Sequence, residues 1–275
     1  MSHPASGPEP TEMARSARRA TAAPAIAPQH GPATLVRYTL GDGVQAAISA
    51  RGGGVSAPPY DSLNLGLRIG DDPDAVAANR EALAAACGLR AVDLAWMRQV
   101  HGADVSYVAA GRNGPADPVD AIFTDAAGLA LCVLVADCAP VLVADPVAGL
   151  VGAAHAGREG LAAGVVPALI AALIAAGARP ARMRVLVGPS ICGRCYEVPA
   201  ELRARVSALV PEASCVTRAG TAGLDIAAGV RAQLSAAGVG RAGADGRCTC
   251  ESAELYSYRR DGTTGRFAAL IWLTP

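Results

Sequence analysis

Apolar and polar positions vary along the chain with two periods, which together predict a mixture of strands and helices. Short apolar or alternating runs bounded by glycine, proline or aspartate are typical of strands. The expected strands are residues 35–40, 45–50, 100–108, 129–135, 141–144, 184–187 and 268–273. Residues 129–135 and 141–144 are apolar throughout, which indicates strands that are buried on both faces.

Longer runs with helical spacing alternate with these strands. The expected helices are residues 74–87, 161–176, 199–209 and 226–237. The first helix follows the start signals Asp72 and Pro73 and ends before Gly88, a residue that commonly terminates helices. Because no repeat or linker interrupts the alternation after residue 33, we expect one α/β domain over residues 34–275 with a mixed sheet.

Residues 1–33 differ from the remainder in composition. They are rich in alanine and proline and lack a continuous apolar segment, so we expect a disordered tail rather than a secretory signal. Residues 126–144 approach the composition of a membrane span, but they contain Asp137 and Pro140 and are better explained by buried strands. We therefore expect a cytoplasmic protein with no membrane partner, whose cysteines are reduced thiols or metal ligands.

The charge balance excludes partners that bind by general electrostatic attraction. Lysine plus arginine number 24 and aspartate plus glutamate also number 24, so the formal net charge is zero and we expect no nucleic-acid partner. With 52% hydrophobic and only 17% charged residues, the chain is too apolar to be disordered as a whole. The candidate chemistry lies in its eight cysteines and four histidines.

Only two histidines, His101 and His155, lie after the predicted tail, and each is close to a glycine near a strand end. Between them, Asp137 and Cys138 follow a very apolar strand, a position where packing alone rarely explains an acid and a thiol. Two imidazoles and one thiolate would form a zinc site with an open fourth position, with Asp137 as a nearby proton acceptor or orienting group. The alternative is that the histidines are hydrogen-bonded structural residues and Cys138 a small buried apolar side chain.

Several longer motifs occur in one order along the chain. They are RGGGVS at 51–56, PYDSLNLG at 59–66, GDDP at 70–73, QVHG at 99–102, ADC at 136–138, AHAG at 154–157 and SYRRDGTTGR at 257–266. Over residues 35–275 the chain resembles the YfiH/YlmD family, the bacterial laccase-domain family whose members are also described as purine nucleoside phosphorylases or polyphenol oxidases.

This resemblance implies a layered α/β/β/α fold with mixed sheets and a zinc ion held by His101, Cys138 and His155. It implies phosphorolysis of adenosine, inosine and methylthioadenosine with inorganic phosphate, giving the free base and the (methylthio)ribose 1-phosphate, together with adenosine deamination. The active protein would be a monomer or a homodimer. A copper-dependent oxidation of phenols is also attributed to the family, and some members are named peptidoglycan editing factors.

Phosphate or nucleoside binding requires local positive charge in a chain of zero net charge. The candidates are Arg51, which opens the glycine-rich segment, and the block of Arg259, Arg260 and Arg266; Arg51 is favoured.

Three further residues are candidate substrate contacts. Asn64 would bind a base or ribose edge or shape the turn before Gly66, and Glu197 matches a polar family position. Family members often read HAGWRG where this chain reads HAGREG, so we expect Arg158 to substitute for the arginine replaced by Glu159.

Two other enzyme classes remain open. A copper-dependent phenol oxidase would use the same three ligands, although four histidines are too few for a multicopper cluster. A metal-free cysteine hydrolase acting on peptidoglycan would use Cys138 as its nucleophile.

The remaining cysteine motifs are a CxxC and a CxC. Cys192, Cys195, Cys248 and Cys250 could form a closed zinc site, but their spacing departs from common zinc ribbons and we expect no second metal there.

Overall fold

The computed structural model describes Met1, residues 33–115 and residues 117–275. The tail predicted for residues 1–33 therefore lies almost entirely outside the described part of the chain.

Two mixed sheets lie face to face at the centre of the molecule. The five-stranded sheet has the order β1 (Leu35–Thr39), β2 (Val44–Ser49), β13 (Phe267–Leu273), β6 (Ala130–Val135) and β3 (Leu94–Trp96). The six-stranded sheet has the order β12 (Ala242–Ala244), β9 (Arg184–Val187), β7 (Ala139–Asp145), β8 (Leu150–Ala156), β5 (Ala121–Thr124) and β4 (Val105–Tyr107). A separate antiparallel pair consists of β10 (Ser214–Val216) and β11 (Ala222–Leu224).

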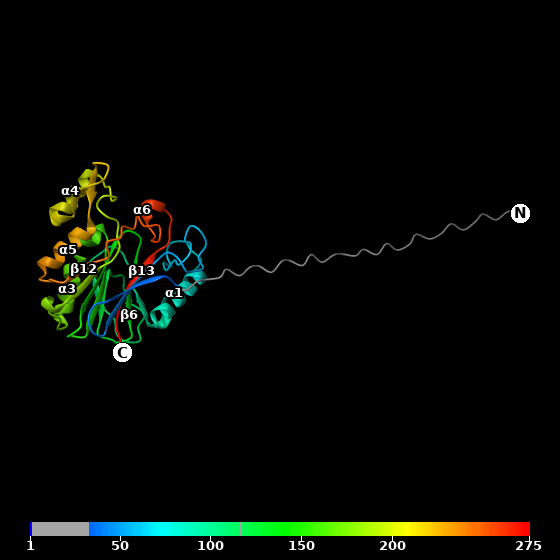
Figure 1. Ribbon diagram of the computed structural model, residues 1–275, viewed down its shortest axis with the longest axis horizontal. Helices are drawn as coiled ribbons and strands as arrows, with labels where there is room; N and C mark the ends of the chain where they lie inside the picture. The colour runs from blue at the N-terminus through cyan, green and yellow to red at the C-terminus, as the bar shows by residue number, and fades with distance from the viewer. Residues whose placement is uncertain (2–32, 116) are drawn as a thin grey trace.

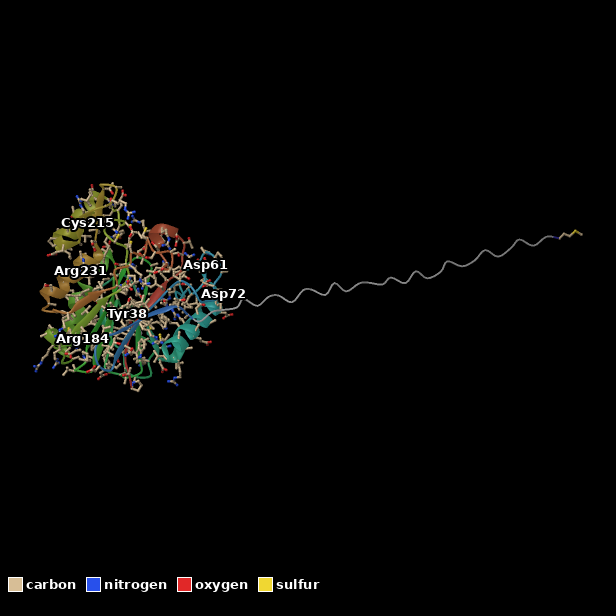
Figure 2. All side chains as sticks on the ribbon, in the orientation of Figure 1. Tyr38, Asp61, Asp72, Arg184, Cys215 and Arg231 are labelled. Atoms are coloured by element: carbon tan, nitrogen blue, oxygen red, sulfur yellow. The ribbon has the colours of Figure 1, made fainter. Side chains whose placement is uncertain are left out.

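Helices cover the outer face of each sheet. Helix α1 (Pro73–Cys87) packs on the five-stranded sheet, and α2 (Arg158–Ala163), α3 (Val165–Ala175), α4 (Ala200–Leu209) and α5 (Ile226–Ala236) lie on the side of the six-stranded sheet. Figure 1 shows α1 on one side of the strands and α3 and α5 on the other. In Figure 2, Asp72, which caps α1, and Arg231 of α5 accordingly lie on opposite sides.

The buried apolar residues form three layers that match this arrangement. One cluster lies between the sheets and includes Ile48, Leu131 and Leu142, while the other two lie under α1 and under α3 and α5. The α/β/β/α layering implied by the family resemblance is therefore confirmed. The single mixed sheet expected from the pattern alone is wrong, because an apolar run does not indicate which of two sheets it joins.

Two local expectations also need correction. The helix expected over 161–176 is two helices, because Gly164 adopts a left-handed conformation (φ 84°) between α2 and α3. The strand expected over 100–108 is limited to β4, because the backbone N–H groups of residues 100–102 bind the carboxylate of Asp120 instead of a neighbouring strand.

Shorter elements complete the fold. They are the 3-10 turns Ala91–Asp93, Pro180–Arg182 and Pro211–Ala213 and the short helix α6 (Tyr258–Asp261). Among the helices of the described residues, none combines the length and the apolar composition needed to cross a bilayer.

Candidate functional site

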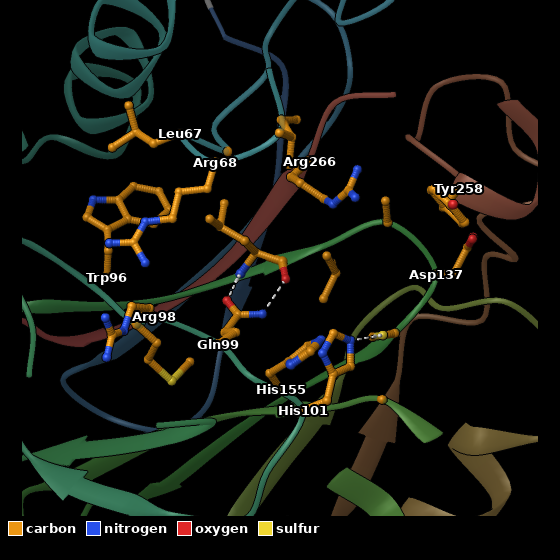
Figure 3. A pocket seen from close by; sticks show the side chains of 18 of the residues that line it. Leu67, Arg68, Trp96, Arg98, Gln99, His101, Asp137, His155, Tyr258 and Arg266 are labelled. Carbon is orange, nitrogen blue, oxygen red and sulfur yellow. Dashed lines mark hydrogen bonds between the residues drawn. The ribbon is translucent and has the colours of Figure 1, made fainter. Parts of the chain in front are cut away.

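A cavity of about 1160 Å³ opens where several loops meet at one end of the two sheets. Its walls come from the segment after β3, the β6–β7 turn, the end of β8 and the C-terminal block around α6. A cavity of this size can hold a small organic ligand. Figure 3 shows Leu67 and Trp96 on one side, with His101 and His155 together at the base.

Three sequence-predicted residues meet at this base. The side chains of His101, Cys138 and His155 place one nitrogen or sulfur atom each within 4.8 Å of the others. His101 Nε2 lies 3.9 Å from Cys138 Sγ, and the two imidazole rings meet edge to face with centroids 4.8 Å apart. The strand pair β7–β8 sets part of this geometry, because Pro140 pairs with His155 and so brings Cys138 beside it.

Asp120 orients two of these three residues. Its carboxylate accepts hydrogen bonds from the backbone N–H groups of Val100, His101 and Gly102 at 3.0, 3.0 and 2.7 Å. It also lies 2.8 Å from Nδ1 of His155, which leaves Nε2 of that ring free to act as a ligand. Asp120 is not recognisable as a site residue from the sequence, because a lone carboxylate before an apolar strand has no distinguishing motif.

The electrostatics of the base favour a deprotonated thiol. Burial alone would raise the pKa of Cys138, but the neighbouring imidazoles of His155 and His101 outweigh it and lower that pKa. Burial would lower the pKa of His155, yet the Cys138 sulfur and the Asp120 carboxylate raise it. Metal binding requires the thiolate and two neutral imidazoles, so a bound cation would displace the proton that the raised pKa favours on His155.

The backbone at this site adopts unusual conformations. His101 and Asp137 have positive φ angles of 64° and 108°, and strain of this kind persists where surrounding contacts enforce it, often at functional sites. Gly157 is needed for a different reason. A Cβ atom there would lie 2.8 Å from the His101 ring and 3.0 Å from Cys138 Sγ, so only glycine leaves room for both.

The Asp137 carboxylate faces the C-terminal block. It accepts hydrogen bonds from the hydroxyls of Thr249 and Ser257 at 2.6 and 2.7 Å and from the backbone N–H of Arg259 at 2.7 Å. Because its oxygens are engaged in this way, Asp137 orients the arginine block that faces the histidines across the cavity.

Three arginines predicted to bind substrate differ in whether a carboxylate pairs with their guanidinium group. Arg158 lines the cavity, but its guanidinium is paired with Glu159 at 2.8 Å. Arg259 and Arg266 also line it, and within the described residues neither has a carboxylate at ion-pair distance. The hydrogen bonds that their guanidinium groups donate to other described residues all go to backbone carbonyls, which carry no negative charge.

Three other predicted residues are not among those lining the cavity. Arg51 is held by ion pairs to Asp61 at 2.9 Å and Asp261 at 3.5 Å. Asn64 is buried, and its amide binds Gly66 and other neighbours, which is the turn-shaping alternative. Glu197 is exposed, and its backbone carbonyl accepts a hydrogen bond from Arg259.

Further lining residues were not selected as candidates from the sequence, although Tyr258 lies within the SYRRDGTTGR motif. They are Arg68, Arg80, Arg98, Trp96, Tyr196 and Tyr258. The Arg80 guanidinium lies 4.0 Å from the Trp96 ring centroid, and that of Arg259 lies 5.1 Å from the Tyr196 ring centroid. Scattered arginines and aromatics are common on any surface, so only the fold reveals that these face one cavity.

The donor set at the base fits a single metal ion. Two imidazoles and one thiolate are borderline-soft ligands suited to zinc or copper, and three protein ligands leave one position open toward the cavity. The Asp120–His155 contact is the carboxylate–histidine pair that commonly supports such ligands.

Comparisons with known proteins find similar sequences over most of the chain. The profile of a family described as multi-copper polyphenol oxidoreductase laccase matches residues 45–274. The chain is 54% identical over 233 residues to a protein of Streptomyces coelicolor named purine nucleoside phosphorylase, covering 84% of this chain and 96% of that protein. It is 39% identical over 240 residues to the purine nucleoside phosphorylase YfiH of Shigella flexneri, covering 86% and 97%.

Solved structures give the same picture. The hypothetical protein YfiH of Bacillus licheniformis superposes with a TM-score of 0.81 at 31% identity, covering 89% of this chain and 97% of that one. YlmD of Geobacillus stearothermophilus superposes with a TM-score of 0.78 at 35% identity, covering 85% and 93%.

Proposed function

Because this chain belongs to the multi-copper polyphenol oxidoreductase laccase family, we propose that it acts as the relatives named purine nucleoside phosphorylase do, cleaving purine nucleosides with inorganic phosphate. The substrates would be adenosine, inosine and methylthioadenosine. The observation that carries the proposal is the three-donor group of His101, Cys138 and His155 facing guanidinium groups across one cavity.

We assign the metal as zinc, held by these three side chains. The thiolate and the two imidazoles match a catalytic zinc site, in which bound zinc supplies Lewis acidity at its open position. Copper would fit the same ligand types, but a multicopper cluster would require more histidines than the four in this sequence. The donor set therefore favours group transfer over oxidation of phenols.

Arg259 and Arg266 are the groups we assign to phosphate. Unpaired guanidinium groups bind phosphate oxygens with two parallel N–H donors, which fixes both position and orientation. Asp137 holds the backbone of Arg259, so it orients the phosphate-binding block. Arg158 would contribute less, because phosphate would have to compete with Glu159 for its guanidinium.

In the proposed reaction, an oxygen of the bound phosphate attacks C1′ of the ribose while the bond from C1′ to the purine nitrogen breaks. The bonding electrons leave with the base, which takes up a proton, and the sugar is released as ribose 1-phosphate. The arginines stabilise the attacking anion and position it at C1′. Adenosine deamination would be a second activity of the same cavity, in which water attacks C6 of adenine, the C6–N bond breaks, and ammonia and inosine are released.

The test is an assay of inosine and adenosine with and without phosphate, alongside metal analysis of the purified protein. We expect hypoxanthine from inosine only when phosphate is present, bound zinc in the wild type, and a Cys138→Ser variant that holds one zinc ion fewer than the wild type and has lost turnover. Cys215→Ser, which changes a half-buried cysteine away from the cavity, is the matched control and should retain both.

Other outcomes would point to the alternatives. Phosphorolysis that persists in Cys138→Ser, when that variant has lost one zinc ion relative to the wild type, would contradict the proposal. Oxidation of a phenol that depends on added copper would favour the oxidase. Metal-independent turnover of a peptidoglycan fragment that requires Cys138 would favour the cysteine hydrolase.

A further inference from the structure

A second cluster of metal-binding side chains lies apart from the trio of His101, Cys138 and His155. It brings together three cysteines and one glutamate from two loops: Cys192, Cys195, Cys248 and Glu251. Their sulfur atoms and one carboxylate oxygen all lie within 4.8 Å of one another, and we call them the Cys3Glu group. Cys250, the other member of the CxC motif, does not belong to it.

The group is built from two turns with the same spacing. Cys192 and Cys195 are three residues apart, and so are Cys248 and Glu251, so each turn contributes its first and last residue. Each turn is closed by a backbone hydrogen bond, from Cys195 N to Cys192 O at 2.9 Å and from Glu251 N to Cys248 O at 3.1 Å. Paired turns of this spacing are the way that structural zinc sites present four ligands.

The two turns are already fixed against each other by the backbone. Ser190 and Cys248 form a parallel bridge, in which Thr249 N donates to Ser190 O at 3.1 Å. The Cys192 N–H points at Cys248 Sγ at 3.3 Å, and the Cys195 thiol lies 3.6 Å from Glu251 Oε1. Ligands around tetrahedral zinc with bonds of ~2.3 Å are separated by ~3.8 Å, so binding needs only a small contraction.

The charge around the group also suits a divalent cation. Three thiolates and a carboxylate carry four negative charges, of which zinc would offset two. Arg194 and Arg218 both pair with Glu251 and would offset the other two.

We propose that the Cys3Glu group binds a second zinc ion in a closed structural site. Four protein ligands leave no open position, so this ion would have no direct part in the reaction. Its effect would be to clamp the 192–195 turn to the 248–251 turn. The clamp would stabilise the cavity wall, because Ile191 and Tyr196 flank the first turn and line the cavity.

Zinc content per chain in the intact protein, purified without chelator, tests this proposal. We expect two zinc ions in the wild type and one in Cys248→Ser. Cys250→Ser is the matched control from the same CxC motif and should retain two. Cys138→Ser should also hold one zinc, and the Cys138→Ser/Cys248→Ser double variant none, so failure of one site is distinguishable from failure of the other.

Alkylation of the wild-type protein provides a second measurement that does not depend on a variant folding. The cysteines at 192, 195 and 248 should resist alkylation until a chelator is added, whereas Cys132, which is fully buried under α1, should stay unreactive with and without the chelator. Equal zinc content in the wild type and Cys248→Ser would overturn the proposal. So would a disulfide among these cysteines in the freshly purified protein, detected as a mass lower by two hydrogens.

Discussion

Asp120 and Asp145 are two buried carboxylates at opposite ends of the six-stranded sheet, and they use the same chemistry for different purposes. Both side chains are fully buried, and each accepts at least four hydrogen bonds. Asp145 ends β7 and binds the guanidinium of Arg182 and the backbone of the following turn. Asp120 precedes β5 and binds the ring of His155 and the backbone that carries His101.

The difference lies in the partner. A guanidinium is always charged and has no lone pair, so the Asp145–Arg182 contact can only hold structure together. An imidazole has a second nitrogen, so the contact of Asp120 with Nδ1 of His155 directs Nε2 of the same ring toward Cys138. A buried carboxylate therefore marks a functional site only when its partner can transmit the orientation to another group.

We expect the largest effect, a loss of stability, from a substitution at Asp145. Asp145→Asn leaves the Arg182 guanidinium without its counter-charge and should lower the free energy of unfolding by about 3 kcal/mol. The measurement is chemical denaturation, with the exposed Asp42→Asn as a control expected to stay within about 0.5 kcal/mol of wild type. The kcat/KM of folded Asp145→Asn should equal that of the wild type, and a loss of activity would break the comparison.

Asp120→Asn should instead act through the metal site. An amide in place of the carboxylate presents an NH2 group to at least one of the N–H donors, which weakens the orientation of His155 and His101. We expect metal affinity and kcat/KM to fall about 10–100-fold. Competition with a chromogenic chelator measures the affinity, and the exposed Asp104→Asn is the control. Wild-type zinc affinity in a folded Asp120→Asn protein would remove the basis for this role.

Two glycines near and within β8 repeat the comparison on a smaller scale. The Cβ of Gly152→Ala would lie 2.9 Å from Leu169, so it should cost about 1–3 kcal/mol of stability through overpacking against α3. The Cβ of Gly157→Ala would press on His101 and Cys138, so zinc should be lost at a lower chelator concentration. If both variants lose zinc at the same chelator concentration, then Gly157 does not differ from Gly152 in its effect on the metal site, and the comparison is wrong.

The smallest effect is a dependence on pH. Burial would raise the pKa of Asp145, but hydrogen bonds from Arg179 and Arg182 outweigh it and hold the pKa below the ordinary value. The stability it contributes is therefore complete above the unfolded pKa of ~3.9 and is lost as the pH falls through the lower folded value. The stability difference between wild type and Asp145→Asn should be constant from about pH 5 to 7 and shrink below about pH 4. A constant difference down to pH 2 would contradict this.

The sequence was most informative where residue types are rare. Only two histidines follow the predicted tail, so His101 and His155 could be selected with little competition, and Cys138 lies beside a polar neighbour after an apolar strand. Asp120 could not be selected from 24 acidic residues, because its role depends on contacts between β5 and distant loops. The glycine-rich motif favours Arg51, whereas the unpaired guanidinium groups that face the cavity belong to Arg259 and Arg266.

The cysteine motifs show a second limit of sequence reasoning. Cys248 was paired with Cys250 because the two thiols form a CxC, yet the fold turns Glu251 rather than Cys250 toward the other cysteines. The two ligands from this turn, Cys248 and Glu251, are three residues apart. A glutamate at that spacing is not distinctive in a sequence with 24 acidic residues. The layered fold was expected from the family motifs, but strand order and the facing of the two sheets depend on long-range pairing that local patterns do not contain.

The register of the β7–β8 pair determines where insertions and deletions can be tolerated. Pro140 faces His155 at the cavity end of the ladder, and Asp145 faces Leu150 at the other end, where the chain turns. Since side chains alternate between faces, deleting one residue within β8 would replace the imidazole at the cavity with a methyl group from Ala154 or Ala156. Extra residues in the turn at 146–149 would leave the ladder in register. Natural length variation in this hairpin should therefore collect in the turn and be absent from the strands.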